Sequence, residues 1–448
     1  MNARNYFLNY PAPWVAPALL AAYALIILSP LAVVGILRPP SDHGFVYTAG
    51  KNFGLVAFTI MAMQFVLAAR LGFIERPFGF DMMFRFHKAM AVVAFALILS
   101  HPVLLALGGN GWSVVFNPQI SWHIWLGRIA LILLWVHIWL AIFRSVLRFE
   151  YQTWRVIHNV AALLVFPFAF VHSYKAGGDM QLGALKAVWI LLFAAGVAAY
   201  SWHRLVRPRL LNSYTVTEVR SETKDVWTIK LAPPAGVKRY DYLPGQFHFL
   251  TFHRNPILPV EEHHWTISSS PTEPGFVSST IKESGDFTAT IGKTKPGDTA
   301  LVLAPFGRFS YLLHPDERDF VFIAGGIGIT PLMSMLRQMR DTRADVSVLL
   351  LYANSCEDDI IFRDEMTEIE GGERPRLKVV HVLSKPGHGW QGEKGHVDHE
   401  KIGRHCGSDL EGKAFYICAP PALTNKVIHY LKGCGVKDRR IHFEYFSF

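Results

Sequence analysis

Cysteine is scarce in this chain of 448 residues. The four cysteines are Cys356, Cys406, Cys418 and Cys434, and no two of them form a Cys-x-x-Cys pair. This argues against a disulfide framework and against a cysteine-ligated iron–sulfur cluster, and it is typical of a reducing cytosolic compartment. The N-terminus also lacks the basic segment, short apolar core and cleavage site of a signal peptide, so we expect the first helix to remain.

Charged residues are scarce as well, at 18% of the chain against 51% hydrophobic residues. Through His203 the sequence has 13 Lys and Arg and 5 Asp and Glu, and the totals of 44 and 35 leave 31 and 30 for the remainder. The net charge of +9 therefore comes almost entirely from the first part. Because these basic residues lie between long apolar runs and form no continuous patch, we expect a lipid bilayer and no nucleic acid as the partner.

Six segments are long and apolar enough to span a membrane: 14–36, 49–69, 82–107, 121–143, 154–174 and 184–202. Lys and Arg gather in the connections after the second, fourth and sixth segments: Arg70, Arg76, Arg85, Lys88, Arg144, Arg148, Arg155, Arg204, Arg207 and Arg209. The connection between the third and fourth segments has none. The positive-inside rule then predicts a multi-pass protein of the cell membrane with both termini in the cytosol.

The pattern changes after Pro208, where short β-rich runs are separated by Pro and Gly turns. Runs such as Tyr214–Val219, Val226–Leu231 and Phe247–Phe252 predict an antiparallel β-barrel to about Leu313. Strands and helices then alternate: Asp319–Ala324, a helix from Thr330, Val346–Tyr352, a helix near Phe362–Ile369, Lys378–Leu383, Ala414–Cys418 and a helix from Pro421. This alternation predicts an α/β doubly wound domain.

Two pairs of histidines share one spacing inside the predicted membrane helices. His87 and His101 lie in the third, and His158 and His172 lie in the fifth, fourteen positions apart in each case. Fourteen residues span about 21 Å of helix and return to nearly the same face. Since both helices run in the same direction, His87 faces His158 and His101 faces His172. Two facing imidazoles can be the axial ligands of one haem iron, so the spacing predicts two stacked b-type haems.

Other polar residues of this part have no such matched partner. For any single His the alternative is a packed or hydrogen-bonded residue, and we interpret His137 in this way or as a contact to a haem propionate. Arg128 is expected near the depth of His101. It either extends to the lipid headgroups, or pairs with a haem propionate or an anionic acceptor.

Nucleotide motifs occur in the second part. The run from His263 to Ser269 reads His-His-Trp-Thr-Ile-Ser-Ser, and it offers rings that stack on a flavin and hydroxyls that bond it. The segment Gly285-Asp286-Phe287-Thr288 follows Lys282 at an expected helix start, where N–H groups can hold a pyrophosphate. The chain ends on Phe448, whose ring either packs as a tail or, as the other motifs favour, lies over the flavin until nicotinamide displaces it.

Two further turns follow buried strands. Phe320–Met335 passes from a strand through Gly325, Gly326 and Gly328 into a helix, which lets the backbone approach a dinucleotide phosphate. The later run Tyr416 to Pro421 again ends a strand at a sharp turn, where Cys418 either flanks the nicotinamide or is a buried small residue.

Together these motifs resemble the ferric reductase and NADPH oxidase superfamily over nearly the whole chain. The resemblance implies that His263, Trp265 and Thr266 belong to the flavin-contacting motif. From the residues themselves we also expect cofactor contacts at His264, Ile267, Ser268, Lys282, Gly285, Phe287 and Thr288. The resemblance also implies a nucleotide phosphate loop at Gly325, Gly326, Gly328 and Thr330, a cysteine–glycine–proline motif at Cys418 and Pro420, and a terminal stacking ring at Phe448. Thr266, Cys418 and Phe448 would be the catalytic contacts.

The sequence departs from the family pattern in several places. His264 replaces a proline of the flavin motif, and Ala419 replaces the glycine beside Cys418. Leu105 stands where animal oxidases carry a further histidine, and no EF-hand loop precedes the first helix. These differences leave a superoxide-forming site and the exact placement of nicotinamide open.

The expected organisation is a six-helix transmembrane haem domain (1–207), a β-barrel FAD domain (208–314) and an α/β NAD(P)H domain (315–448). The expected activity is electron transfer from cytosolic NADPH or NADH through FAD and two b-type haems to O2, a ferric complex or an extracytoplasmic redox protein. The resemblance favours NADPH, and the oligomeric state stays open. The alternatives are a six-helix metal transporter with a nucleotide-binding regulatory domain and a haem-free flavin reductase.

Overall fold

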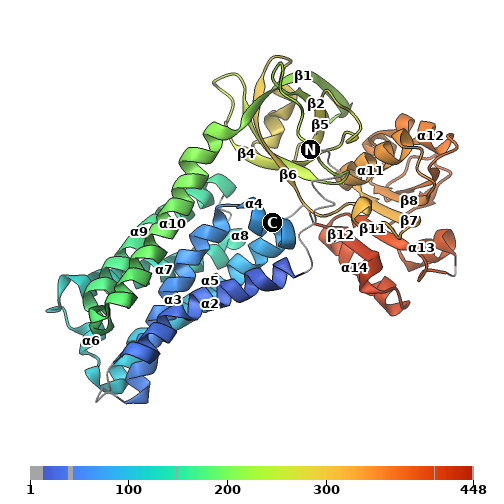
Figure 1. Ribbon diagram of the computed structural model, residues 1–448. Coiled ribbons are helices and arrows are strands. Elements are labelled where there is room, and N and C mark those ends of the chain that lie inside the picture. The colour runs from blue at the N-terminus through green and yellow to red at the C-terminus, as the bar shows by residue number, and fades with distance from the viewer. Residues whose placement is uncertain (1–13, 39–43, 148–149, 408, 446–448) are drawn as a thin grey trace. The chain divides into compact units, whose positions relative to one another are not determined.

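The computed structural model describes residues 14–38, 44–147, 150–407 and 409–445 (Figure 1). The chain divides between Arg209 and Leu210 into two compact units. The N-terminal unit is helical, and the C-terminal unit contains two six-stranded sheets.

The helical unit is built on six long helices, which confirms the number of apolar segments predicted from the sequence. They are α2 (Val15–Leu37), α3 (Phe45–Ala68), α5 (Phe80–Leu105), α7 (Trp122–Ile142), α9 (Tyr151–Ala176) and α10 (Gly183–Ser201). Shorter helices lie between them: α4 (Gly72–Phe78), α6 (Ser113–Phe116) and α8 (Arg144–Leu147). Gly79, with a φ of +78°, allows the abrupt change of direction between α4 and α5.

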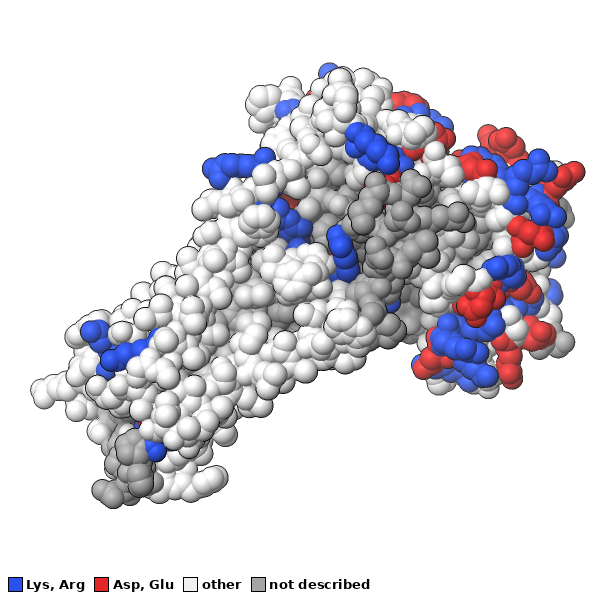
Figure 2. Space-filling model, viewed as in Figure 1, with Lys and Arg blue, Asp and Glu red and all other residues white. Residues whose placement is uncertain are grey.

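Aromatic rings fill the core of the helical unit. Phe58 of α3 stacks on Phe166 of α9, with ring centroids 5.5 Å apart, and on Trp189 of α10 at 4.7 Å. Helix α3 also packs along α5, and α7 packs along α9. The outward faces carry many exposed apolar side chains, and Figure 2 shows few charged residues on the visible face of these helices. An apolar surface of this extent is typical of helices that contact lipid.

An antiparallel sheet begins the C-terminal unit, with strand order β4-β3-β6-β1-β2-β5. Its strands are β1 (Asn212–Thr223), β2 (Val226–Ala232), β3 (Phe247–His253), β4 (Glu262–Thr266), β5 (Val277–Lys282) and β6 (Thr299–Phe306). The two edge strands meet just beyond β4, where the N–H of Ser268 donates to the carbonyl of Ser278 at 2.8 Å. The sheet therefore curls into the predicted barrel.

A parallel sheet follows, with strand order β10-β9-β8-β7-β11-β12. Its strands are β7 (Asp319–Gly325), β8 (Ser347–Asn354), β9 (Arg376–Leu383), β10 (Glu393–Lys394), β11 (Ala414–Cys418) and β12 (Ile441–Glu444). Helices cover both of its faces: α11 (Ile329–Asp341), α12 (Arg363–Glu370), α13 (His399–Cys406) and α14 (Pro421–Gly433). The strand order reverses between β7 and β11, and this switch point is where doubly wound folds bind ligands.

Candidate functional site

The four histidines with the fourteen-residue spacing meet in two pairs between α5 and α9. The ring centroids of His87 and His158 are 6.3 Å apart, with an interplanar angle of 58°. Those of His101 and His172 are 6.4 Å apart, with an angle of 79°. Metal–imidazole bonds of about 2.0 Å on both sides of an iron would separate two ring centroids by about 6.3 Å. The separation in both pairs would therefore fit one metal ion held between two imidazoles.

Hydrogen bonds at the remote ring nitrogens orient three of these rings. Nδ1 of His101 bonds the carbonyl of Gly50 at 2.7 Å, and Nδ1 of His172 bonds the carbonyl of His123 at 3.0 Å. A carbonyl can only accept, so in both residues Nδ1 carries the proton and Nε2 is left as the free ligand atom. Such a hydrogen bond fixes the tautomer of a metal-binding histidine and raises its basicity.

Two glycines make room for the His101 and His172 rings. A Cβ at Gly54 would lie 3.0 Å from Nδ1 of His101, and a Cβ at Gly127 would lie 2.6 Å from Nδ1 of His172. The second distance is shorter than any real Cβ contact, so only glycine fits at that position of α7 with the ring where it is. The sequence interpretation missed both glycines, because a glycine inside an apolar helix gives no signal of what lies opposite it.

His137 has the role of a hydrogen-bonded residue, as one of its two interpretations stated. Its Nε2 lies 2.9 Å from Nδ1 of His158, and its ring stacks on Trp154 with centroids 5.3 Å apart and an angle of 11°. The third oriented ring, that of His158, thus bonds another imidazole, whereas the rings of His101 and His172 bond backbone carbonyls.

Arg128 has partners that the sequence did not indicate. Its guanidinium donates to the carbonyls of Ser113, Val114 and Asn117, with shortest distances of 2.9 Å to Val114 and 2.8 Å to Asn117. It also lies over the Trp125 ring at 4.8 Å. The side chain therefore holds α6 and the residue that follows it. The sequence had suggested a contact with a lipid headgroup, a haem propionate or an anionic acceptor, and none of these includes the three carbonyls.

The flavin motif occupies β4 and the turn after it. His263 stacks on Phe287, with centroids 4.3 Å apart, and on Trp265 at 5.5 Å. Thr266 is buried, and in the part of the chain that the structure describes its hydroxyl has no hydrogen-bond partner. A buried hydroxyl without a partner is costly, so this residue fits a role in bonding a flavin edge. His264 lies on the same strand, beside Phe247 and Phe249.

Side chains just after Thr266 face inward. Ile267 belongs to the barrel core, and the Ser268 hydroxyl bonds Ser278 and Thr280. Their predicted contacts with FAD can therefore come only from the backbone. The same turn is fastened to α11, because Arg337 donates to the Ser268 carbonyl at 2.5 Å while it pairs with Glu365 at 2.6 Å. The sequence interpretation did not single out Arg337.

The expected pyrophosphate segment is a tight turn before a short 3-10 helix over Thr288–Lys293. The N–H groups of Ser284 and Gly285 both donate to the Thr288 hydroxyl at 2.8 Å, so these two donors are already engaged. Phe287 is buried, and Lys282 pairs with Asp225 at 3.4 Å. The segment's role toward FAD stays a prediction.

The glycine loop after β7 lies directly against the turn after β11. A Cβ at Gly325 would lie 2.7 Å from Pro420, and a Cβ at Gly328 would lie 2.1 Å from the Cys418 carbonyl. Gly326 has a φ of +54°, and the Thr330 hydroxyl donates to Ile327 at 3.0 Å. These contacts explain why the loop needs glycine at each position.

A cavity of about 1030 Å³ opens at this switch point. It is lined by Gly325, Gly326, Asn354, Pro420 and Lys282, among other residues. Its size suits a dinucleotide. Cys418 is fully buried, and burial raises the pKa of its thiol well above the ordinary value. Phe448 lies outside the described residues, so its stacking role stays a prediction.

Comparison with known proteins agrees with this division. Residues 53–169 match the family described as ferric reductase like transmembrane component, and residues 322–428 match the oxidoreductase NAD-binding domain. The chain is 26% identical over 286 residues to the plasma membrane-associated coenzyme Q6 reductase PGA3 of Saccharomyces cerevisiae, covering 63% of this chain and 89% of that protein. It is 30% identical to NADH-cytochrome b5 reductase 2 of Rattus norvegicus, covering 37% and 70%.

Among solved structures, the FAD/NAD-binding domain of nitric oxide dioxygenase from Vibrio cholerae O1 biovar El Tor superposes with a TM-score of 0.47 at 22% identity. That match covers 52% of this chain and 98% of the other.

The fold and the sites define a membrane-bound, NAD(P)H-dependent oxidoreductase of the flavin type. The chain joins a ferric-reductase-like transmembrane part to a ferredoxin–NADP reductase-type NAD-binding module, a combination that supports the ferric reductase and NADPH oxidase superfamily.

Proposed function

We propose that this protein carries electrons from cytosolic NADPH or NADH across the cell membrane to O2 or to a ferric complex. The route would run from FAD through two b-type haems, held by His87 with His158 and by His101 with His172. The observation that carries the proposal is the pair of His–His separations of 6.3 and 6.4 Å on the same two helices. The three domains would be 1–207, 208–314 and 315–448, with both termini cytosolic.

The chain's own residues would bind and orient the reactants. The loop of Gly325, Gly326 and Gly328 would hold the nucleotide phosphates at the start of α11, where N–H groups point outward. Thr266 would donate its unpaired hydroxyl to the flavin. Flavin supplies the conversion between a hydride and single electrons, which haem iron accepts.

The two histidine pairs differ in the groups that orient them. The positive-inside rule would place His87 and His158 near the cytosol and His101 and His172 near the outer face. Backbone carbonyls orient the outer pair, and His137 orients His158 of the inner pair. The two pairs would therefore differ in ligand basicity, which is one determinant of haem potential.

Reconstitution of the full chain in liposomes tests the proposal. With NADPH or NADH on the cytosolic side, the protein should show reduced b-type bands and should produce superoxide or ferrous iron on the other side. His101→Ala should lose one haem of two and acceptor reduction, with flavin reduction intact. A purified protein that is colourless would favour the transporter alternative, one that is only yellow would favour a haem-free flavin reductase, and full haem content in His101→Ala would overturn the ligand assignment.

A further inference from the structure

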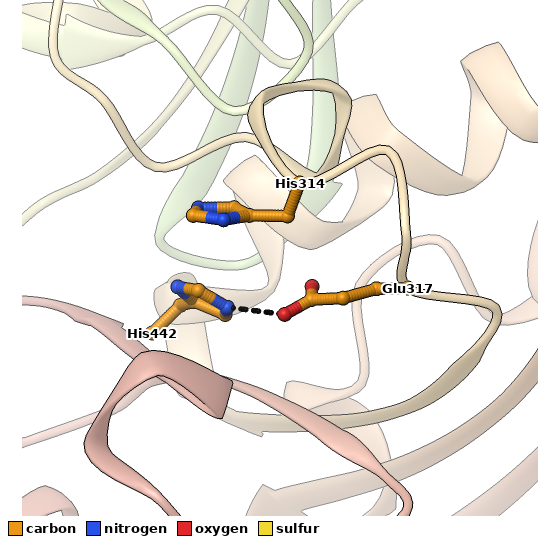
Figure 3. A group of neighbouring side chains, drawn as sticks. All are labelled: His314, Glu317 and His442. Carbon is orange, nitrogen blue, oxygen red and sulfur yellow. Dashed lines mark hydrogen bonds and ion pairs between the residues drawn. The ribbon is translucent and has the colours of Figure 1, made fainter. Parts of the chain in front are cut away.

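Three potential metal ligands converge in the C-terminal unit, outside the flavin and nucleotide sites. His314 and Glu317 lie in the segment that joins β6 to β7, and His442 lies on β12 (Figure 3). One ligand atom from each residue lies within 4.8 Å of the other two. None of the three lines the nucleotide cavity.

Glu317 is held as a buried carboxylate. It is 3% exposed, one oxygen accepts a hydrogen bond from Nε2 of His442 at 2.9 Å, and the other accepts one from the Tyr416 hydroxyl at 2.8 Å. Burying a carboxylate is costly without donors or a cation, and these two bonds offset that cost only in part. Tyr416 also orients the carboxylate, as an outer residue commonly does for a metal ligand.

The two imidazoles lie one above the other. Their ring centroids are 4.0 Å apart with an angle of 35°, and Figure 3 shows the His314 ring above that of His442. Stacked imidazoles beside one carboxylate form an N2O ligand set, which suits Zn²⁺ with an open fourth position. Ligand atoms on a tetrahedral Zn²⁺ lie about 3.3 Å apart for bonds of about 2.0 Å, so these ligand atoms, which lie within 4.8 Å of one another, would draw together as the two rings unstack around the ion.

We propose that His314, Glu317 and His442 bind a divalent transition-metal ion of the Zn²⁺ class. The ion would tie the connection between the barrel and the parallel sheet to β12, the strand that precedes the chain terminus. It would therefore fix the segment that enters the parallel sheet against the edge strand of that sheet. The proposal does not depend on the haem route or on the identity of the electron acceptor.

Metal uptake by the full chain, loaded with haem and FAD and free of any affinity tag, tests the site. After chelation, equilibrium dialysis against ZnCl₂ should load one Zn²⁺ per chain. His314→Gln and Glu317→Gln should weaken this uptake by more than about tenfold, which is the loss that replacing an outer hydrogen-bond partner of a metal ligand already causes. His388→Gln, which changes an exposed histidine of the same unit, should not.

Two further measurements guard against misfolding and against binding at other histidines. FAD content should be equal in wild type and His314→Gln, because this half-buried residue is outside the flavin motif. Absorption spectroscopy at the zinc edge should report two imidazoles per Zn²⁺ in wild type. The proposal is overturned if wild type takes up no stoichiometric Zn²⁺, if His314→Gln with full FAD takes up as much, or if the bound Zn²⁺ has fewer than two imidazoles.

Discussion

Nε2 of His137 lies 2.9 Å from Nδ1 of His158, so that a histidine of α7 holds a histidine of α9 by its remote nitrogen. Stacking on Trp154 fixes the His137 ring in turn. We therefore expect His137 to act as a positioning residue for the proposed haem ligand. When His137 accepts this hydrogen bond, the proton of the neutral His158 ring is on Nδ1. Nε2 of His158 is then unprotonated, and the ring is held in its orientation toward His87.

Replacing His137 tests that role. His137→Ala should weaken retention of one haem by about 10–100-fold and raise the potential of that haem, because the ligand becomes less basic. Redox titration and the electron paramagnetic resonance signal of both haems would report the change. His123→Ala is the matched control on the same helix, since His123 serves His172 through its carbonyl. Equal potentials in wild type and His137→Ala would contradict the assignment.

Gly127 gives a steric test of the other pair. Gly127→Ala would place a Cβ 2.6 Å from the His172 ring, so the ring or α7 must move. We expect the variant to lose most of one haem while it keeps FAD and NAD(P)H-dependent flavin reduction. Gly183→Ala, where no atom lies within 4 Å of the new Cβ, should keep both haems. Full haem loading of Gly127→Ala would show that the ring is not confined by this glycine.

His248 predicts how the FAD domain responds to pH. It is fully buried on β3, between the Tyr240 hydroxyl and the Ser279 hydroxyl at 2.6 Å each. Because Ser279 donates its proton to the Thr266 carbonyl, His248 donates from Nε2 and accepts at Nδ1, as a neutral imidazole. Burial lowers its pKa to about 3.

The unfolded chain therefore binds the additional proton and the folded chain does not. The contribution of the neutral His248 to the free energy of unfolding is complete above the unfolded pKa of about 6.5. It is lost as pH falls toward 3, by about 1.4 kcal/mol per pH unit. The temperature of FAD release should thus fall between pH 7.5 and 5.5 in wild type, and fall less in His248→Gln. Parallel pH profiles would exclude His248 as the cause.

Phe448 remains the predicted ring over the flavin. Removing the ring should let nicotinamide reside longer on the flavin and should change the preference between NADPH and NADH. Steady-state kinetics of Phe448→Ser with both nucleotides is the measurement, and Phe443→Ser, which removes an exposed ring of β12, is a control for general disturbance. Unchanged kinetics with both nucleotides would count against the prediction.

The elements that follow from hydropathy could be predicted from the sequence, and those that depend on tertiary partners could not. The six long helices and strands β7, β8 and β11 are continuous apolar runs, which local pattern alone identifies. Strand β5 reads Val-Ser-Ser-Thr-Ile-Lys, and both of its serines are buried with hydrogen-bond partners: Ser278 bonds Ser268 and Ser269, and Ser279 bonds His248 and the Thr266 carbonyl. That pairing is invisible in the local sequence.

The candidate histidine site likewise has one feature that the sequence could predict and one that it could not. The fourteen-residue spacing of the histidines is a property of one helix at a time, so it could be read from the sequence. The partners of their remote nitrogens could not, because Gly50 and His137 come from other helices whose rotation about their axes no spacing determines.

The hydrogen bonds of Arg128 also depend on tertiary partners that the sequence did not indicate. They call for a test of how Arg128 holds α6, in addition to a test of its effect on a haem. The guanidinium bonds three carbonyls near the end of α6. Charge-assisted hydrogen bonds of this kind contribute about 1.5–3 kcal/mol each where they are shielded from water. Lysine keeps the positive charge but cannot bridge several carbonyls with a planar fork. Arg128→Leu and Arg128→Lys should therefore both increase amide hydrogen exchange in residues 113–117. If the charge acted mainly on a nearby haem, Arg128→Lys would keep the haem potentials of wild type and Arg128→Leu would lower one of them. Hydrogen exchange by mass spectrometry and redox titration of the same two variants separate these roles. If residues 113–117 exchange as slowly in Arg128→Lys as in wild type, the bridging of several carbonyls by the guanidinium is not what holds α6.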